Sequence, residues 1–348
     1  MSHRIKIGIV GFGRIGAEHA AWVGASSGLR VGAVFDPTPE RSALAASRGL
    51  RTAESMDALL SDDSIDAVLV STPTSMHYDP ALAALQAGKH VMVEKPMTLV
   101  AKHAAELIRV ATEQKRTLSV FHCRRWDVDF LTVLQLVKSG ALGRVFSIES
   151  RLSQWASCVG PAAREFRPEW RNEARFGGGG LYDWGSHFID QLWRLHWPAK
   201  PARVFAQLRG NVWTRDCDDL ARVCIDFDDG TVGLCEINTT TTRPLPRWHL
   251  DGTLGSADSP HSLTFDTREW AKLRLALADG TQRDLPLAPV GLNETAIWEQ
   301  FARSCRGEGP PAVLAQTAYQ TMVLLDAARE SWRDGTVVPV ATGNWVIE

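Results

Sequence analysis

The chain has 348 residues, and this length favours two domains over one. Hydrophobic residues make up 45% and charged residues 22% of it, which excludes a disordered or collagen-like protein. The net charge of -2 gives no field that would attract nucleic acid, and no apolar stretch approaches the roughly 18 residues that a membrane span needs. The six cysteines form no C-x-x-C pair, so we expect neither a zinc site nor a disulfide framework, and a cytoplasmic location.

Short β-branched segments alternate with helical segments in the first 122 residues. This alternation predicts crossover connections, and therefore a parallel sheet covered by helices on both faces. The predicted strands span residues 4–10, 29–35, 65–72, 90–94 and 117–122, and the predicted helices span 17–25, 37–49, 78–87 and 99–115.

The pattern changes after about residue 122, where strand begins to follow strand. The segments ARVCIDF and TVGLCEINTT flank an Asp-Gly pair, which suits a tight antiparallel hairpin. We therefore expect an N-terminal α/β domain over residues 1–122 and a C-terminal α+β domain over residues 123–348. The remaining predicted elements are helices over 130–140, 294–305 and 314–331 and strands over 143–155 and 336–340.

A glycine-rich turn, GFGRIG, joins the first strand to the first helix. Gly11 permits the tight turn, Gly13 lets the backbone approach a pyrophosphate, and Gly16 lets the helix pack closely on the strand. The N–H groups at the start of the helix are free to bind a phosphate. The turn in this strand–helix context predicts a Rossmann dinucleotide site, although the glycines could also merely shape a turn.

An acidic residue, Asp36, ends the second predicted strand. Its carboxylate can accept hydrogen bonds from ribose hydroxyls and would repel a 2'-phosphate, so NAD is favoured as the cofactor. Arg41 lies close enough in sequence to leave NADP open. In the alternative interpretation, Asp36 only caps the next helix.

Three further segments carry a resemblance to a known family. They are STPTSMHYDPALAALQAGKHVMVEKPMTL at 71–99, HCRRWDVDFLTVLQLVKSGALGRV at 122–145 and GGGGLYDWGSHFIDQL at 177–192. Together with the glycine turn, they resemble the glucose-fructose oxidoreductase and inositol dehydrogenase family, often written Gfo/Idh/MocA. The patterns RRWD-x-D-F and D-x-G-x-H-x-I-D-Q within these segments look most similar to the branch of scyllo-inositol and other sugar dehydrogenases.

This resemblance implies a Rossmann domain followed by a domain with a large, open, mostly antiparallel sheet. It places the catalytic residues at Lys95, Asp183 and His187. It also implies a homodimer or homotetramer and a small carbohydrate-like substrate. The expected cofactor contacts are Gly11, Phe12, Gly13, Arg14, Ile15, Gly16, Asp36, Ser71, Thr72, Pro73, His77, Glu94 and Lys95.

The three catalytic candidates suit the oxidation of a secondary alcohol. A neutral imidazole at His187 can take the hydroxyl proton, and Asp183, one helical turn earlier, is expected to orient it. The ammonium of Lys95 can hold the reacting oxygen. Each residue also has a structural interpretation: a solvated lysine, a helix-capping acid and a core histidine. We expect no metal, because no third ligand accompanies the Asp/His pair.

Tryptophans and arginines near these motifs are candidates for substrate contacts, through aromatic stacking on a sugar face and through hydrogen bonds to hydroxyls or a carboxylate. The substrate-binding candidates beside the catalytic residues are Arg125, Trp126, Arg151, Trp155 and Arg171, with Trp170 and Trp184 close by. The tryptophans expected in the core are Trp22, Trp193, Trp298 and Trp332.

Three other functions stay open. A bound NAD could oxidise and then reduce the substrate, giving an epimerase or a glycoside-cleaving enzyme without net redox change. The chain could also be a nucleotide-dependent sensor, although a sensor does not need Lys95, Asp183 and His187. An imine or biliverdin-type reductase would differ in substrate class.

Overall fold

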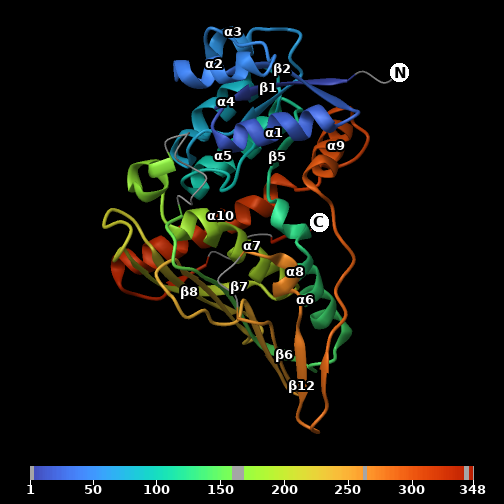
Figure 1. Ribbon diagram of the computed structural model, residues 1–348, viewed down its shortest axis with the longest axis vertical. Coiled ribbons are helices and arrows are strands. Elements are labelled where there is room, and N and C mark those ends of the chain that lie inside the picture. Colours follow the sequence, from blue (N-terminus) through green and yellow to red (C-terminus); the bar gives the residue numbers. More distant parts are fainter. Residues whose placement is uncertain (1–3, 159–167, 262–264, 341–344, 348) are drawn as a thin grey trace.

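The computed structural model describes residues 4–158, 168–261, 265–340 and 345–347. Within these residues, the strands form one sheet of five and one sheet of nine. The smaller sheet lies at one end of the molecule, and helices separate it from the larger one (Figure 1). The predicted fold, a Rossmann domain followed by a domain with a large, mostly antiparallel sheet, is confirmed.

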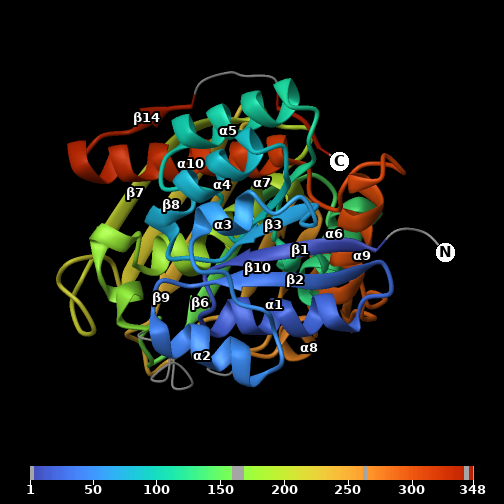
Figure 2. The same cartoon turned by 90° about the horizontal axis from the view of Figure 1, so that it is seen from above.

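The first sheet is parallel and has the strand order β2-β1-β3-β4-β5. Its strands are almost continuously apolar because helices cover both faces. Figure 2 shows α1 and α2 on one side of β1 and β2, and α4 and α5 on the other. The strands are β1 Ile5–Val10, β2 Leu29–Phe35, β3 Ala67–Val70, β4 His90–Val93 and β5 Leu118–Val120, and the helices are α1 Arg14–Ala25, α2 Pro39–Ser47, α3 Met56–Leu60, α4 Tyr78–Gln86 and α5 Ala101–Glu113.

The second sheet has the order β13-β12-β11-β10-β6-β9-β8-β7-β14. It is antiparallel except for the parallel pair β6 and β9. The predicted Asp-Gly hairpin is the pair β8 and β9. The strands are β6 Val145–Ser153, β7 Pro201–Arg209, β8 Leu220–Phe227, β9 Val232–Asn238, β10 Trp248–Gly252, β11 Gly255–Asp258, β12 Arg274–Leu277, β13 Gln282–Asp284 and β14 Val338–Pro339.

Helices of the second half lie between the two sheets and pack on one face of the larger one. Among them, α7 contacts β6 and β9, and α10 contacts β7. These helices are α6 Val128–Ser139, α7 Ser186–Leu195, α8 Thr267–Trp270, α9 Glu294–Cys305 and α10 Ala315–Asp334, with short 3-10 helices at Thr74–Met76, Cys123–Trp126, Pro168–Asn172 and Ala174–Phe176 and a π-helix at Leu181–Gly185.

The helix α9 returns to the Rossmann domain, although it lies far along the chain. Trp298 and Phe301 are fully buried in the same core cluster as Ile7 and Ile9. The carboxylate of Glu299 accepts hydrogen bonds from the loop between α1 and β2, at Ser26 Oγ and at Ser27 N, both at 2.6 Å. The C-terminal half of the chain therefore contributes one layer to the N-terminal domain. The domain boundary at residue 122 stays a prediction.

Candidate functional site

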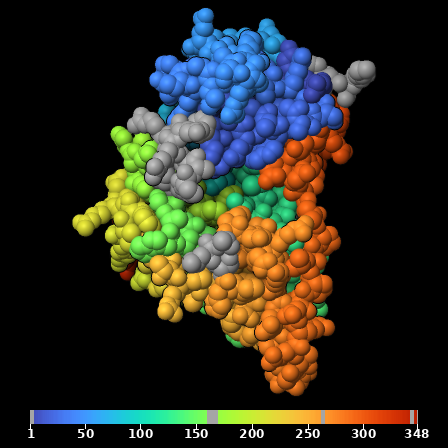
Figure 3. All heavy atoms as spheres, in the orientation of Figure 1, coloured from blue at the N-terminus to red at the C-terminus, as the bar shows by residue number. Residues whose placement is uncertain are grey.

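A pocket of about 380 Å³ lies at the carboxyl ends of the Rossmann strands. In open parallel sheets this edge is where ligands bind. The lining residues come from the segments that follow β1, β3, β4 and β5, and from the segment around the π-helix of the second domain. In Figure 3 the blue residues of the Rossmann domain lie above the green and orange residues of the second domain. The pocket is therefore shared between the two domains.

The glycine turn forms one end of this pocket. Gly11 has φ +93°, and a Cβ there would lie 2.9 Å from the backbone of Ser71, whose hydroxyl donates to Gly11 O at 2.7 Å. A Cβ at Gly13 would meet nothing within 4 Å, and α1 begins after it without a capping side chain. The N–H groups at the start of α1 thus face an open cradle, which fits the pyrophosphate of a dinucleotide.

Asp36 fastens this turn to β2. Its carboxylate accepts hydrogen bonds from Phe12 N at 2.7 Å and from Thr38 N at 2.9 Å, and it lies 3.6 Å from the guanidinium of Arg41. Asp36 is buried. The carboxylate therefore holds the turn and the loop before α2, whose N-cap is Thr38 without a side-chain capping bond, and the contact of Asp36 with a ribose stays a prediction.

Lys95 and Asp183 meet in the pocket, one from each domain. Lys95 Nζ donates to Asp183 O at 2.7 Å and lies 3.1 Å from Asp183 Oδ1. Arg171 Nε is 3.5 Å from the same oxygen. Burial alone would raise the pKa of Asp183, but the charges of Lys95 and Arg171 hold it below the ordinary value. The two cations thus share one ionised carboxylate.

His187 also lines the pocket, at the start of α7. Burial, followed by the charges of Lys95 and Arg124, holds the pKa of His187 well below its ordinary value, so the imidazole is neutral. Its Nδ1 is buried without a hydrogen-bond partner among the described residues. A neutral imidazole in this position can accept a proton.

The expected orientation of His187 by Asp183 is wrong. The carboxylate of Asp183 points instead to Lys95 and Arg171. The physical reason is the charge of these two cations, which lie 3.1 and 3.5 Å from the same oxygen of Asp183.

Glu94 lines the pocket and belongs to a buried chain of hydrogen bonds. Trp298 Nε1 donates to His19 Nδ1 at 3.0 Å, so the other nitrogen of His19 carries the proton that faces Glu94 Oε1 at 2.8 Å. Although burial raises the pKa of Glu94, the hydrogen bond from His19 and nearby positive charges bring it below its ordinary value. Glu94 is therefore a fixed anion beside Lys95.

His77 connects two of the loops that surround the pocket. Its ring nitrogens lie 2.9 Å from the carbonyl oxygens of Thr72, after β3, and of Pro96, after β4. Burial lowers its pKa, so the ring is neutral and donates to one of these oxygens at a time. His77 thereby positions the loop that carries Lys95.

Several predicted substrate residues lie elsewhere. Trp126 packs against both hydrophobic cores. Arg151 pairs with Glu149 on β6, and Trp155 is half exposed and packs against Trp213. Arg171 and the nearby Trp170 and Trp184 do line the pocket. Of the tryptophans expected in the core, Trp193 and Trp298 are fully buried, Trp22 lines the pocket and Trp332 is exposed.

Arg125 is a structural residue rather than part of the pocket. Its guanidinium makes two hydrogen bonds to Asp190, at 2.8 and 2.7 Å, and both side chains are buried. The pKa of Asp190 lies far below its ordinary value because the charge of Arg125 outweighs the effect of burial. The prediction that Arg125 binds substrate is therefore wrong.

We expect Arg125→Ala to lower the free energy of unfolding by about 3–5 kcal/mol, because it leaves a buried carboxylate without its partner. Urea denaturation of the purified variant measures this loss. The matched control is Arg109→Ala, which removes an exposed ion pair with Glu113 and should leave stability nearly unchanged. A loss no larger than that of the control would contradict the structural role of Arg125.

Arg124 is among the lining residues that the sequence did not identify. It lines the pocket, whereas its neighbour Arg125 does not. Both arginines belong to the RRWD motif, which indicated that an arginine lies at the site. The motif does not tell which of the two faces the ligand. Glu294 at the start of α9 also lines the pocket and had no sequence signal.

Two further features of the described residues concern metals and membranes. No group of three or more His, Cys, Asp or Glu side chains in this part of the chain could hold a metal ion. Within the same residues, no helix combines the length and the apolar character that a bilayer crossing requires.

The glycine turn, the parallel sheet and the shared pocket define a two-domain dinucleotide-binding protein. A family model described as an oxidoreductase family with an NAD-binding Rossmann fold matches residues 5–122. A model of the GFO/IDH/MocA C-terminal domain matches residues 130–258. The chain belongs to the Gfo/Idh/MocA oxidoreductase family, and its N-terminal domain is an NAD-binding domain.

The chain is also similar to individual proteins. The scyllo-inositol 2-dehydrogenase (NADP(+)) IolW of Bacillus subtilis is 32% identical over 227 residues, which cover 64% of this chain and only 60% of the relative. The 1,5-anhydro-D-fructose reductase of Ensifer adhaerens is 27% identical over 339 residues, which make up 97% of this chain and 98% of the relative. The structure of an NAD-binding protein from Listeria innocua has a TM-score of 0.86 at 30% identity, over 98% of both chains.

Proposed function

We propose that the chain is an NAD(P)-dependent oxidoreductase acting on a secondary alcohol or ketone of a sugar, an inositol-like polyol or a glycoside. The observation that supports this proposal is the meeting of Lys95, Asp183 and His187 in one pocket that continues to the glycine turn. The printed activities of the relatives, an inositol dehydrogenase and an anhydrofructose reductase, are of this chemical class.

In the oxidative direction, the alcohol carbon loses a hydride and its hydroxyl loses a proton, which leaves a carbonyl group. When bound, the nicotinamide supplies the hydride acceptor. His187 takes the hydroxyl proton on its neutral imidazole. Lys95 donates a hydrogen bond to the substrate oxygen and stabilises the negative charge that develops on it. Asp183 holds the ammonium of Lys95 in place.

The test is a screen of the purified protein with NAD and NADP against inositols, monosaccharides, uronates and glycosides, followed by the absorbance of the reduced cofactor. Reduction of cofactor by at least one alcohol is the expected result. No reduction across the panel, with cofactor still bound to the protein, would contradict a dehydrogenase and favour a redox-neutral enzyme or a sensor.

The Asp36 carboxylate is expected to set the preference between the two cofactors. Asp36→Ala should weaken NADH binding by about tenfold, because it removes an acceptor of charge-assisted hydrogen bonds at the turn. It should also raise the ratio of kcat/KM for NADP over NAD, since the carboxylate that would repel a 2'-phosphate is then gone. Fluorescence titration and steady-state kinetics measure the two effects.

The control for this variant is Asp57→Ala, an exposed acid on α3 away from the pocket. Thermal unfolding of both variants separates a local effect on the turn from loss of fold. Unchanged NADH affinity and an unchanged cofactor ratio in Asp36→Ala would remove Asp36 from the cofactor site.

We also propose that the protein forms a homodimer or homotetramer through the larger sheet. Its helices α7 and α10 pack on one face. The opposite face of β7 and β9 carries Phe205 and Val232, each 38% exposed, which favours contact with a second copy. Light scattering of the purified protein measures the mass, and a monomer at micromolar concentration would contradict the proposal.

A further inference from the structure

The described pocket lining as a whole carries as many cations as carboxylates. The cations are Arg14, Lys95, Arg124 and Arg171, and the carboxylates are Glu18, Glu94, Asp183 and Glu294. Lys95 and Arg171 lie 3.1 and 3.5 Å from the same oxygen of Asp183. That carboxylate is therefore already divided between two cations, and it does not neutralise Arg124.

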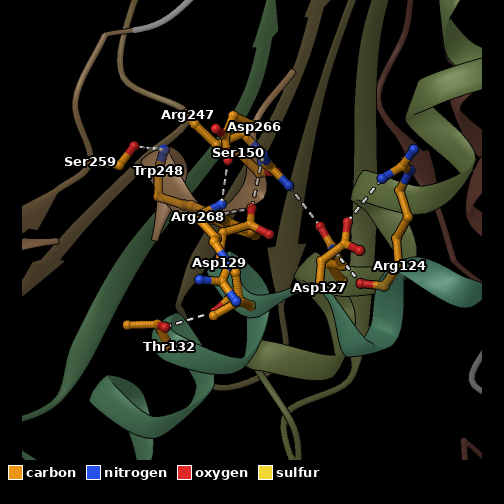
Figure 4. Close-up of polar contacts among 12 residues, drawn as sticks. Arg124, Asp127, Asp129, Thr132, Ser150, Arg247, Trp248, Ser259, Asp266 and Arg268 are labelled. Carbon is orange, nitrogen blue, oxygen red and sulfur yellow. Dashed lines mark hydrogen bonds and ion pairs between the residues drawn. The ribbon is translucent and has the colours of Figure 1, made fainter. Parts of the chain in front are cut away.

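The Arg124 side chain is held in one orientation. Its Nη1 donates to Asp127 at 3.0 Å, as Figure 4 shows. Its guanidinium carbon lies 4.9 Å from the ring centre of Trp184 and 4.2 Å from that of Phe265, so two aromatic rings flank the planar group. An arginine fixed in this way loses little entropy when it binds a planar, bidentate acceptor.

The backbone beneath Arg124 is also anchored. The amide of Gln191 donates to Arg124 O at 2.7 Å and accepts from Arg247 at 2.8 Å. Arg247 in turn lies 3.6 Å from the ring centre of Phe188 and is 2% exposed. This buried scaffold has no need of Arg124's charge, because the contacts reach only its backbone oxygen.

Arg124 differs from its buried neighbours in exposure. The side chains of Arg125 and Arg247 are each 2% exposed and pair with buried carboxylates, whereas that of Arg124 is 22% exposed and lines the pocket. Its Nε is buried and has no hydrogen-bond partner among the described residues. Arg124 is thus a fixed guanidinium that lines the pocket.

We propose that the substrate is an acid, a sugar acid or acidic polyol whose carboxylate is bound by Arg124, with Arg171 contributing positive charge from the other side. This inference rests on the proposed function and names the substrate class of the same site. Planar guanidinium groups match carboxylates through two parallel hydrogen bonds, which are stronger than those to neutral hydroxyls. The carboxylate would fix the ring so that a neighbouring hydroxyl faces Lys95 and His187.

The electrostatics of His187 agree with this substrate class. Burial lowers the pKa of His187 most, and the charges of Lys95, Arg124 and Arg125 lower it further. An imidazole that must accept a proton among cations gains from a negative charge placed nearby. A substrate carboxylate at Arg124 supplies that charge, and a neutral sugar does not.

Calorimetric titration with matched acids and amides tests the proposal. The protein, saturated with NADH, is titrated with D-glucuronate, D-galacturonate and D-gluconate and with the amide of each. At least one acid should bind about tenfold or more tightly than its own amide, and this advantage should shrink as sodium chloride is raised from 0.05 to 0.5 M. If no acid binds more tightly than its amide, the proposal is overturned.

Variants then assign the effect to Arg124. Arg124→Gln keeps an amide donor but removes the charge, and it should reduce the acid-over-amide ratio to within threefold. Arg175→Gln is the matched control, because Arg175 is 72% exposed, pairs with Glu173 and is not among the lining residues. An acid preference that survives in Arg124→Gln, with thermal unfolding like that of the wild type, overturns the assignment.

The two proposals fail in different ways. The proposed function fails if no alcohol in the screen reduces the cofactor, even if an acid or an amide binds in the calorimetric titration. The acid proposal fails on the binding ratio alone, including the case in which neutral polyols are oxidised and acids hold no advantage.

Discussion

Replacement of Lys95 by alanine is expected to lower kcat for alcohol oxidation by about 10²–10³-fold, the usual effect of removing a donor that stabilises a developing oxyanion. Lys95 is 17% exposed at the pocket and brings the only ammonium group among the described lining residues. Steady-state kinetics with a substrate from the screen measures the change. NADH affinity should stay within about threefold, because the glycine turn is untouched.

Two further variants test whether the ammonium of Lys95 causes this loss of kcat. Lys102→Ala, which removes an exposed lysine on α5, should leave kcat unchanged. Lys95→Met keeps the length of the side chain without the ammonium and should match Lys95→Ala. The proposed role of Lys95 is contradicted if either Lys95 variant retains near-normal kcat.

Loss of Lys95 also changes the ionisation of its partner. The pKa of Asp183 stays low because the charges of Lys95 and Arg171 outweigh burial. With Lys95 removed, only Arg171 opposes the effect of burial, so the pKa of Asp183 should rise. The variant thus probes the whole Lys95–Asp183–Arg171 group and not a single side chain.

The fold could be predicted from the sequence because its signals are local. A β-branched run followed by a glycine turn and a helix has one common solution, and β1, the turn and α1 adopt it. The hairpin of β8 and β9 follows equally from its Asp-Gly turn. Long-range packing left no such signal: the helix at Glu294–Cys305 was expected, but not its place in the Rossmann core.

The site was predicted in part. Lys95, Asp183 and His187 do lie in one pocket, as the resemblance implied. The relation of Asp183 to His187 was not predictable, because the carboxylate of Asp183 pairs with Lys95 of the other domain, a contact that spacing along the chain does not reveal. In the same way, Arg124 and Arg125 are adjacent in a 3-10 turn and point to different surroundings, a pocket and a buried carboxylate.

His187→Ala is expected to lower kcat by about 10²–10⁴-fold, the contribution of a positioned general base. The pH profile identifies the residue. Burial and neighbouring cations hold the pKa of His187 well below 6.5, so it takes up a proton only at pH values below that of an ordinary histidine. In the wild type, kcat/KM for oxidation should therefore stay level as the pH falls through 6.5 and decline only at lower pH.

Variants of His187 and of a second histidine should differ at low pH. The acidic decline should be absent from the residual activity of His187→Ala, whereas His249→Gln, a partly exposed histidine on β10, should keep the wild-type profile. The pH profile of kcat reports pKa values in the enzyme–substrate complex, where a substrate carboxylate at Arg124 would offset the surrounding cations. The acidic decline in kcat should therefore lie at higher pH with such a substrate than with a neutral one. An acidic limb of kcat/KM centred at or above 6.5 with a neutral alcohol would contradict His187 as the base.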